Sequence, residues 1–256
     1  HKIYTDESHM LPYLFQGAKH AYIKDVTLQG VALESPAVTL NNCEIENIEY
    51  TLFERRVYSM DDFLKIQNDA KFGVRTFHIM ADFDFSDWSD ANEAADQADK
   101  KTSVISQLVY GVATDYAKFN GNGHTFTGLR GASLFDKFSF VDFHDINFND
   151  SSNIQDASTS RYVSLIAKQS YHSKFSDIYF NNVSLQGAFN VGFVVGDDGF
   201  IGSNGAAKRE TGSQFSRIQV TNGSVVNGSK AAGNSSCYAG FITGRAYNSD
   251  FEDIYV

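Results

Sequence analysis

One short motif recurs along the chain and constrains its fold more than any other feature. The motif has an aromatic residue or Ile, one variable residue, a polar residue that is most often Asp, and then Ile or Val. Its copies start at Ile23, Ile45, Phe143, Phe175, Phe215 and Phe251. A motif that recurs with the same residue types in the same order is typical of repeat architectures, in which each unit packs against the next.

The spacing between copies predicts the size of one structural unit. The shortest spacing, from Ile23 to Ile45, is 22 residues, which suits one coil built from three strands of about five residues and their turns. A second apolar segment precedes the motif, since Phe135 lies 10 residues before Asp145 and the same offset recurs in the first copy. The longer spacings predict coils that carry loops inserted at one corner.

These observations predict an all-β fold, a right-handed parallel β-helix in which each coil stacks on the one before it. Stacking at roughly 4.8 Å per coil pairs the backbones of successive coils and covers apolar side chains that one coil cannot bury alone. The aromatic residue and the Ile or Val of each motif then form inward ladders, while the Asp between them points outward or lies at a corner. A β-sandwich is the alternative, but sandwiches do not need the same side-chain register in every strand.

Other polar residues of the repeat are expected at the corners and on the surface. The pairs Asn181-Asn182 and Asn222-Gly223 contain residues that tolerate the left-handed backbone conformation of tight turns. Asp177, Arg217 and Asp253 share one position of the repeat. They are therefore expected to stack as a ladder of ion pairs.

We expect residues 1–256 to form a single β-helix, with both ends cut from a longer chain. Residues 1–56 would form the first coils. Residues 57–128 would hold a helix and a strand before the coil pattern returns, and residues 129–256 would form regular coils.

Residues 57–128 interrupt the repeat and are called the insertion. Within it, the sequence predicts one short helix near residues 60–71. Ser59 can cap the N-terminus of this helix, and acidic residues follow in its first turn. A strand is expected at 76–81 and a turn at 82–87. Residues 88–103 are predicted to be an exposed loop or a short helix.

Composition and charge exclude several classes of function. Hydrophobic residues make up 42% of the chain and charged residues 20%, which is the balance of a folded protein. The net charge is −10, and without a basic cluster this argues against nucleic acid as a partner. No run of about 18 apolar residues occurs, so no membrane contact is expected. Two cysteines, Cys43 and Cys237, are too few for a disulfide framework or a Cys-rich zinc site.

Several segments, taken in order, resemble a known family. They are a helix starting Val57-Tyr58-Ser59-Met60-Asp61, the stretch Asn120-Gly121-Asn122-Gly123-His124-Thr125, the sequence Gly192-Phe193-Val194-Val195-Gly196, and the Ser-x-Phe-x-Asp-Ile repeats. Over about residues 57–256, the chain resembles the β-helical region that precedes the catalytic domain in streptococcal-type immunoglobulin A zinc metallopeptidases, and the related GLUG-repeat cell-surface proteins. The resemblance implies an extracellular protein, secreted or held on a bacterial cell surface.

The resemblance also implies that the zinc ion lies elsewhere. Peptidases of this type hold zinc with a His-Glu-x-x-His motif in a separate C-terminal domain. None of the 7 histidines here has that context, and His78 is followed by Ile79 and Met80. The segment itself is expected to contain no catalytic residue and no cofactor.

Two site candidates lie within residues 57–128. Asp82, Asp84, Ser86 and Asp87 offer oxygen atoms at the alternating positions that calcium loops use, although the Gly and the final Glu of an EF-hand loop are missing. A solvated turn is the alternative there. His124 could act as a ligand or a base, but we favour a corner residue whose ring bonds to the backbone of another coil.

The sequence favours a non-catalytic, extracellular β-helix segment of a bacterial surface zinc metallopeptidase, which recognises its substrate or serves as a scaffold. The partner would be a host glycoprotein, an immunoglobulin or a surface glycan. Insertions at 88–103 and 196–213 would decorate one side of the solenoid. One alternative is a GLUG-type adhesin without a protease. A second is a carbohydrate-active β-helix enzyme, which would need two carboxylates facing one groove.

Overall fold

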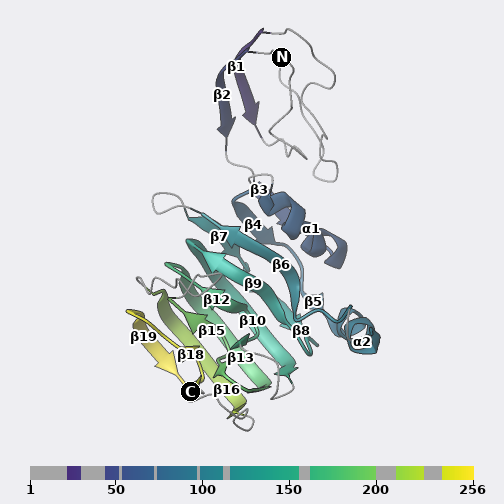
Figure 1. Cartoon of the computed structure of the whole chain (residues 1–256), viewed down its shortest axis with the longest axis vertical. Coiled ribbons are helices and arrows are strands. Elements are labelled where there is room, and N and C mark those ends of the chain that lie inside the picture. The colour runs from purple at the N-terminus through teal and green to yellow at the C-terminus, as the bar shows by residue number, and fades with distance from the viewer. Residues whose placement is uncertain are drawn as a thin grey trace.

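The computed structural model shows a stack of parallel coils (Figure 1). It describes residues 22–29, 44–51, 54–71, 74–96, 99–111, 116–155, 162–199, 212–227 and 238–256. Cys43 and Cys237 lie outside these residues, as does most of the predicted insertion at 196–213. Every strand pair in the described part of the chain is parallel.

Three parallel sheets form the sides of the stack, and the chain visits them in a repeating order. The first sheet contains β3 (Glu54–Val57), β4 (Thr76–Ile79), β7 (Ala117–Asn120), β10 (Val141–Ile154), β13 (Lys174–Gly187), β16 (Gln214–Asn227) and β19 (Asp250–Tyr255), together with β5 (Phe83–Asp84) and β8 (Thr125–Thr127). The second contains β11 (Tyr162–Val163), β14 (Asn190–Val191) and β17 (Tyr238–Ala239). The third contains β6 (Ser103–Tyr110), β9 (Ser133–Ser139), β12 (Ala167–Ser170), β15 (Val195–Asp198) and β18 (Thr243–Arg245). This arrangement confirms the predicted parallel β-helix.

The aromatic position of the motif forms the predicted inward ladder. In register, Phe77 pairs with Phe119, and the series continues through Phe143, Phe175, Phe215 and Phe251. The rings of Phe175 and Phe215 stack with their centroids 5.2 Å apart and their planes 7° apart. Except for Phe251 in the last strand, these side chains are buried. Stacking of this kind adds to the hydrophobic gain from burial.

The polar position of the motif forms a corner. Asp145, Asp177, Arg217 and Asp253 have φ between 50 and 61°. A second corner follows five residues later, where Asp150, Asn182 and Asn222 have φ between 48 and 53°. Asn and Asp tolerate this left-handed conformation better than most residues. The sequence left two positions open for the Asp, outward or at a corner, and the structure shows the corner.

The helix α1 (Met60–Lys71) lies at one end of the stack, next to β3 and β4 (Figure 1). The Asp62 N–H donates to the Ser59 Oγ at 3.2 Å, so Ser59 caps the helix as predicted. Phe63 is fully buried, and its ring centroid lies 5.4 Å from that of Phe85 and 5.7 Å from that of Phe126. The helix therefore covers the apolar interior of the neighbouring coils.

The structure has a second helix besides the one predicted near residues 60–71, in the region where the sequence left a loop or a short helix open. α2 (Ser86–Ala94) begins inside the segment expected to be a turn. The Asp84 carboxylate accepts a 2.9 Å hydrogen bond from the Ser86 N–H, which satisfies one of the free N–H groups at the start of the helix. The Ser89 hydroxyl then donates to the Gly128 carbonyl at 3.0 Å. That contact comes from residues far apart in sequence, which is why local pattern did not distinguish a helix from a loop here.

The first two copies of the motif pair with each other. β1 (Tyr22–Gln29) and β2 (Glu44–Thr51) run parallel, with Ile23 opposite Ile45 and Val26 opposite Ile48. This is the register that the repeat predicts. The predicted division of the chain at residues 56 and 128 stays a prediction.

Two substitutions in one motif copy test the assignment of inward and corner positions. Phe175→Asp should lower the free energy of unfolding by about 4 kcal/mol or more, because it places a charge in the buried ladder and removes a large apolar side chain. Asp177→Asn should have a much smaller effect, because Asn also accepts a left-handed φ. Urea denaturation followed by circular dichroism measures both. Equal losses from the two variants would contradict the register.

Candidate functional site

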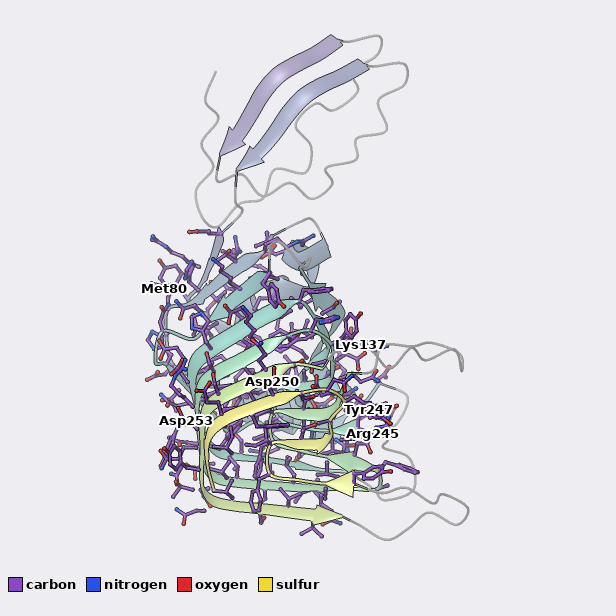
Figure 2. The ribbon with its side chains drawn as sticks, turned by 90° about the vertical axis from the view of Figure 1, so that its left-hand side faces the viewer. Met80, Lys137, Arg245, Tyr247, Asp250 and Asp253 are labelled. Carbon is purple, nitrogen blue, oxygen red and sulfur yellow. The ribbon has the colours of Figure 1, made fainter. Side chains whose placement is uncertain are left out.

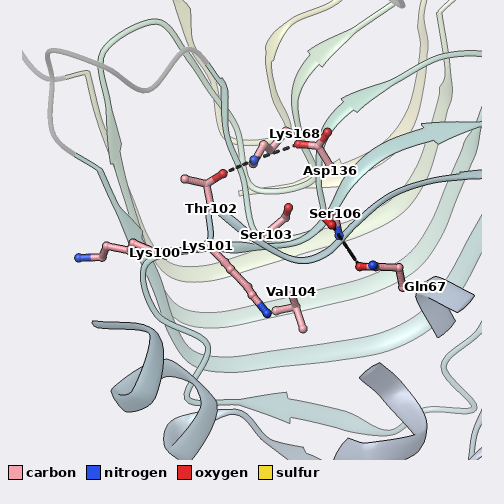
Figure 3. Close-up of a pocket in the computed structure, with 9 residues that line it drawn as sticks. All are labelled: Gln67, Lys100, Lys101, Thr102, Ser103, Val104, Ser106, Asp136 and Lys168. Atoms are coloured by element: carbon pink, nitrogen blue, oxygen red, sulfur yellow. Dashed lines mark hydrogen bonds and ion pairs between the residues drawn. The ribbon is translucent and has the colours of Figure 1, made fainter. Parts of the chain in front are cut away.

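A polar hollow lies where the insertion meets the regular coils (Figure 3). It has a volume of about 450 Å³. Its walls come from α1, from β6 and the segment that leads into it, and from β9 and β12. The lining residues are Gln67, Lys100, Lys101, Thr102, Ser103, Val104, Ser106, Asp136 and Lys168. Three lysines, one carboxylate and a set of hydroxyl and amide groups therefore surround one cavity on an acidic protein.

The segment that carries Lys100 and Lys101 is bonded through the backbone N–H and carbonyl of Lys101 to an asparagine of α2. The Asn92 amide donates to the Lys101 carbonyl at 2.8 Å, and the Lys101 N–H donates to the Asn92 Oδ1 at 2.7 Å. Asn92 is only 7% exposed. α2 itself is fastened to the neighbouring coil by Ser89 and by ion pairs from Asp90 and Glu93 to Arg130. The second helix thus positions one wall of the hollow.

Lys168 is fixed by two partners. Its ammonium lies 2.9 Å from the Asp136 Oδ1 and also donates to the Thr102 Oγ1. Asp136 and Lys168 lie opposite each other on paired strands, because Phe135 pairs with Ala167 and Lys137 with Gln169. The side chain of Lys168 is 15% exposed. A lysine has three N–H donors, and one of them is left without a partner among the described residues.

Gln67 orients its amide by contacts with Ser106. The N–H of Ser106 and its hydroxyl both lie within hydrogen-bonding distance of the Gln67 Oε1, at 3.3 and 3.1 Å. Because a backbone N–H must bond to the amide oxygen, the assignment of oxygen and nitrogen is settled by this contact. The NH₂ group of Gln67 is consequently left as a donor.

Two of the calcium candidates, Asp82 and Asp84, have partners within the chain. The Asp82 carboxylate accepts a 2.8 Å hydrogen bond from the Thr125 N–H, and the His124 Nδ1 lies 3.0 Å from the same oxygen. Asp84 accepts the hydrogen bond from the Ser86 N–H at the start of α2, and Asp87 lies in the first turn of that helix. Among the described residues, no group of three or more His, Cys, Asp or Glu side chains is arranged to hold a metal ion.

His124 links two coils, but not by the contact that we expected from the sequence. Its ring bonds to the Asp82 side chain and not to a backbone group. The two hydrogen bonds, first from Thr125 and then from His124, lower the pKa of Asp82 below its usual value of 3.8. The sequence did not show this pairing, because the two residues are 42 positions apart.

The predicted ion-pair ladder is present in part. Arg217 donates from Nε and Nη2 to the two oxygens of Asp177, at 2.6 and 2.7 Å. These hydrogen bonds lower the pKa of Asp177 and raise that of Arg217, and the charge of Asp253 contributes to the latter shift. Figure 2 shows Asp253 on one side of the stack, with Lys137 and Arg245 on the other. The ladder is therefore remote from the third sheet, to which the hollow belongs.

A buried carboxylate lies at a corner of the later coils. Asp198 is fully buried and accepts hydrogen bonds from the Ser213 N–H at 2.7 Å and from the hydroxyls of Ser213 and Ser249, each at 2.6 Å. The Ser170 hydroxyl also donates to it. Both of its oxygens are therefore satisfied, and the residue joins successive coils.

Comparisons with known protein families, with curated proteins and with solved structures give no match. Within the described residues, no helix has the length and hydropathy needed to cross a membrane. The candidate site therefore depends on the geometry of the hollow alone.

Replacing the buried carboxylate tests its structural role. Asp198→Ala should lower the free energy of unfolding by about 3 kcal/mol, because several buried donors lose their acceptor. Asp250→Ala, at an exposed position of β19, is the matched control and should change stability little. Urea denaturation of both variants measures the difference. If the two variants were equally stable, the hydrogen bonds of Asp198 would not contribute as described.

The pKa of Asp82 gives a test by titration. Because the pKa of Asp82 is lower in the folded chain, its carboxyl group becomes charged at a lower pH there than in the unfolded chain. Its contribution to stability is therefore present above pH 3.8 and is lost as the pH falls through the folded pKa. His124→Ala should raise the Asp82 midpoint toward the usual value, as measured by NMR of the side-chain carboxyl carbon. An unchanged midpoint would contradict the contact, and a midpoint that depends on added calcium would favour a calcium site instead.

Proposed function

We propose that this chain is a non-catalytic, extracellular β-helix segment that binds a host glycoprotein. The observation that carries the proposal is that the residues of the repeat and the residues of the hollow have different roles. The motif residues are used in ladders and corners, while the hollow at the insertion gathers polar side chains that packing does not require. A rigid solenoid with a polar hollow on one side suits recognition.

The chemistry of the hollow favours binding over catalysis. Among the described residues that line it, Asp136 is the one carboxylate, and it is paired with Lys168. Glycoside hydrolysis usually needs two carboxyl groups that flank the bond to be cleaved. A carbohydrate-active enzyme is therefore the weaker alternative for this site.

We propose further that the parent is a bacterial surface protein of the immunoglobulin A zinc metallopeptidase type. In this proposal a separate domain holds the zinc ion and cleaves the substrate. The motif order within residues 57–256 supports this assignment. A GLUG-type adhesin without a protease shares the same coils, and it would use the same glycoprotein-binding function.

Binding to a glycoprotein tests the function. The purified chain should bind immobilised immunoglobulin A or a mucin-type glycoprotein in surface plasmon resonance. Enzymatic removal of the glycans should weaken this binding by about tenfold or more, because a loss of about 1.4 kcal/mol of contact energy has that effect. The glycoproteins should remain intact after prolonged incubation.

Serum albumin, which lacks glycans, is the control surface. Equal binding to all surfaces would contradict the proposal, and so would binding that survives deglycosylation unchanged. Cleavage of a glycoprotein by the purified chain would contradict the non-catalytic part alone.

A further inference from the structure

We propose that the hollow between α1, β6, β9 and β12 binds a terminal acidic sugar, through the carboxylate or sulfate group that such a sugar carries. The inference rests on the proposed glycoprotein-binding function and names the part of the ligand that is recognised. It depends on the donors of the hollow, on its size and on the charge of the protein around it.

The hollow is rich in hydrogen-bond donors. Lys168 retains one N–H donor, the NH₂ group of Gln67 is oriented by Ser106, and the Thr102 hydroxyl accepts from Lys168 so that its own hydrogen is free to donate. The ammonium groups of Lys100 and Lys101 have no ion-pair partner in the described part of the chain. The single carboxylate is already paired. The unpaired charge at the site is therefore positive, and it favours an anion.

Lys100 and Lys101, the two exposed lysines at the rim of the hollow, carry positive charges on flexible side chains. Figure 3 shows Lys168 directed toward Asp136 and Thr102, while the Lys100 side chain extends away from them. Lys100 and Lys101 are exposed, and a lysine side chain is a flexible stem with a compact charge. Asn92 fixes only the backbone of Lys101. The site thus combines fixed donors on its walls with mobile charges on its rim.

Size and surroundings select among anions. A volume of about 450 Å³ lies in the range of small-molecule sites and exceeds the needs of one inorganic anion. The hydroxyl and amide groups of Ser103, Ser106 and Gln67 suit the hydroxyl groups of a sugar ring. The chain has a net charge of −10, which repels a long polyanion such as heparin or nucleic acid. These properties favour one acidic unit at the end of a neutral glycan.

Isothermal titration of the whole chain with defined oligosaccharides tests this inference. The probes are sialyllactose, which carries one carboxylate, a lactose that carries one sulfate, and neutral lactose. At 150 mM salt, at least one of the two acidic probes should bind about tenfold or more tightly than lactose, and the stronger one identifies the acidic group. Equal binding of all three, or binding only to heparin or to an acidic peptide, would overturn the inference.

Charge-reversal variants locate the binding. Lys100→Glu/Lys101→Glu should weaken the binding of the acidic probe about tenfold or more. Lys118→Glu/Lys174→Glu changes the net charge equally at exposed positions that do not line the hollow, and it should leave binding within about twofold. Lys168→Gln removes one fixed charge and keeps a donor for Asp136, so it should also weaken binding without unfolding the chain, as circular dichroism would verify.

The outcomes separate this inference from the proposed function. If the hollow variants bind the glycoprotein and the acidic probe as well as the unmodified chain does, the hollow is not the site, although glycoprotein binding stands. If both lysine pairs weaken binding equally, general electrostatic attraction explains the result and the inference fails. If the unmodified chain binds neither the glycoprotein nor any probe, the proposed function fails as well.

Discussion

The left-handed residue at each corner is the constraint on which the rest of this structure depends. Side chains in a strand alternate between two faces, so residues three apart, such as Phe143 and Ile146, would point in opposite directions. The extra residue at Asp145, with φ 61°, resets the alternation. Both Phe143 and Ile146 are consequently buried. The same reset at each copy lets every coil present its apolar residues to one interior, and stacking then follows from the register.

That constraint explains which features the sequence could predict. The corner residue must be Asp, Asn or another residue that tolerates φ above zero, and the residues two before it and one after it are apolar, so the motif is visible without any structure. The parallel register, the ladder through Phe175 and the capped helix at Ser59 followed from such local rules. Arg217 departs from the usual Asp at this position, and aligning the copies still predicted its ion pair with Asp177 of the preceding coil.

The candidate site could not be predicted in the same way, because its residues share no local pattern. Gln67, Lys101, Asp136 and Lys168 come from four segments, and only the folded coils bring them together. The acidic residues at 82–87 show the same limit, because their spacing fits a calcium loop and the structure also gives Asp82 and Asp84 hydrogen bonds within the chain. Asp84 accepts a hydrogen bond from the first residue of α2, and Asp82 bonds to His124 of the next coil. The spacing of these residues showed that carboxylate oxygens were present, but not which hydrogen-bond donors they would contact in the folded chain.

The position of the hollow follows from the physics of the coil. A regular coil uses its inward residues for packing and its corner residues for backbone geometry, which leaves outward positions as the variable part. An insertion adds residues that neither pack in the interior nor set the backbone geometry of a corner, provided that contacts with the coils hold it in place. Here α2 is that anchor, since Ser89 bonds to Gly128 and Asn92 bonds to the backbone of Lys101. Lysines on a segment anchored in this way can face a fixed wall without any change to the ladders, so recognition can vary while the fold is kept.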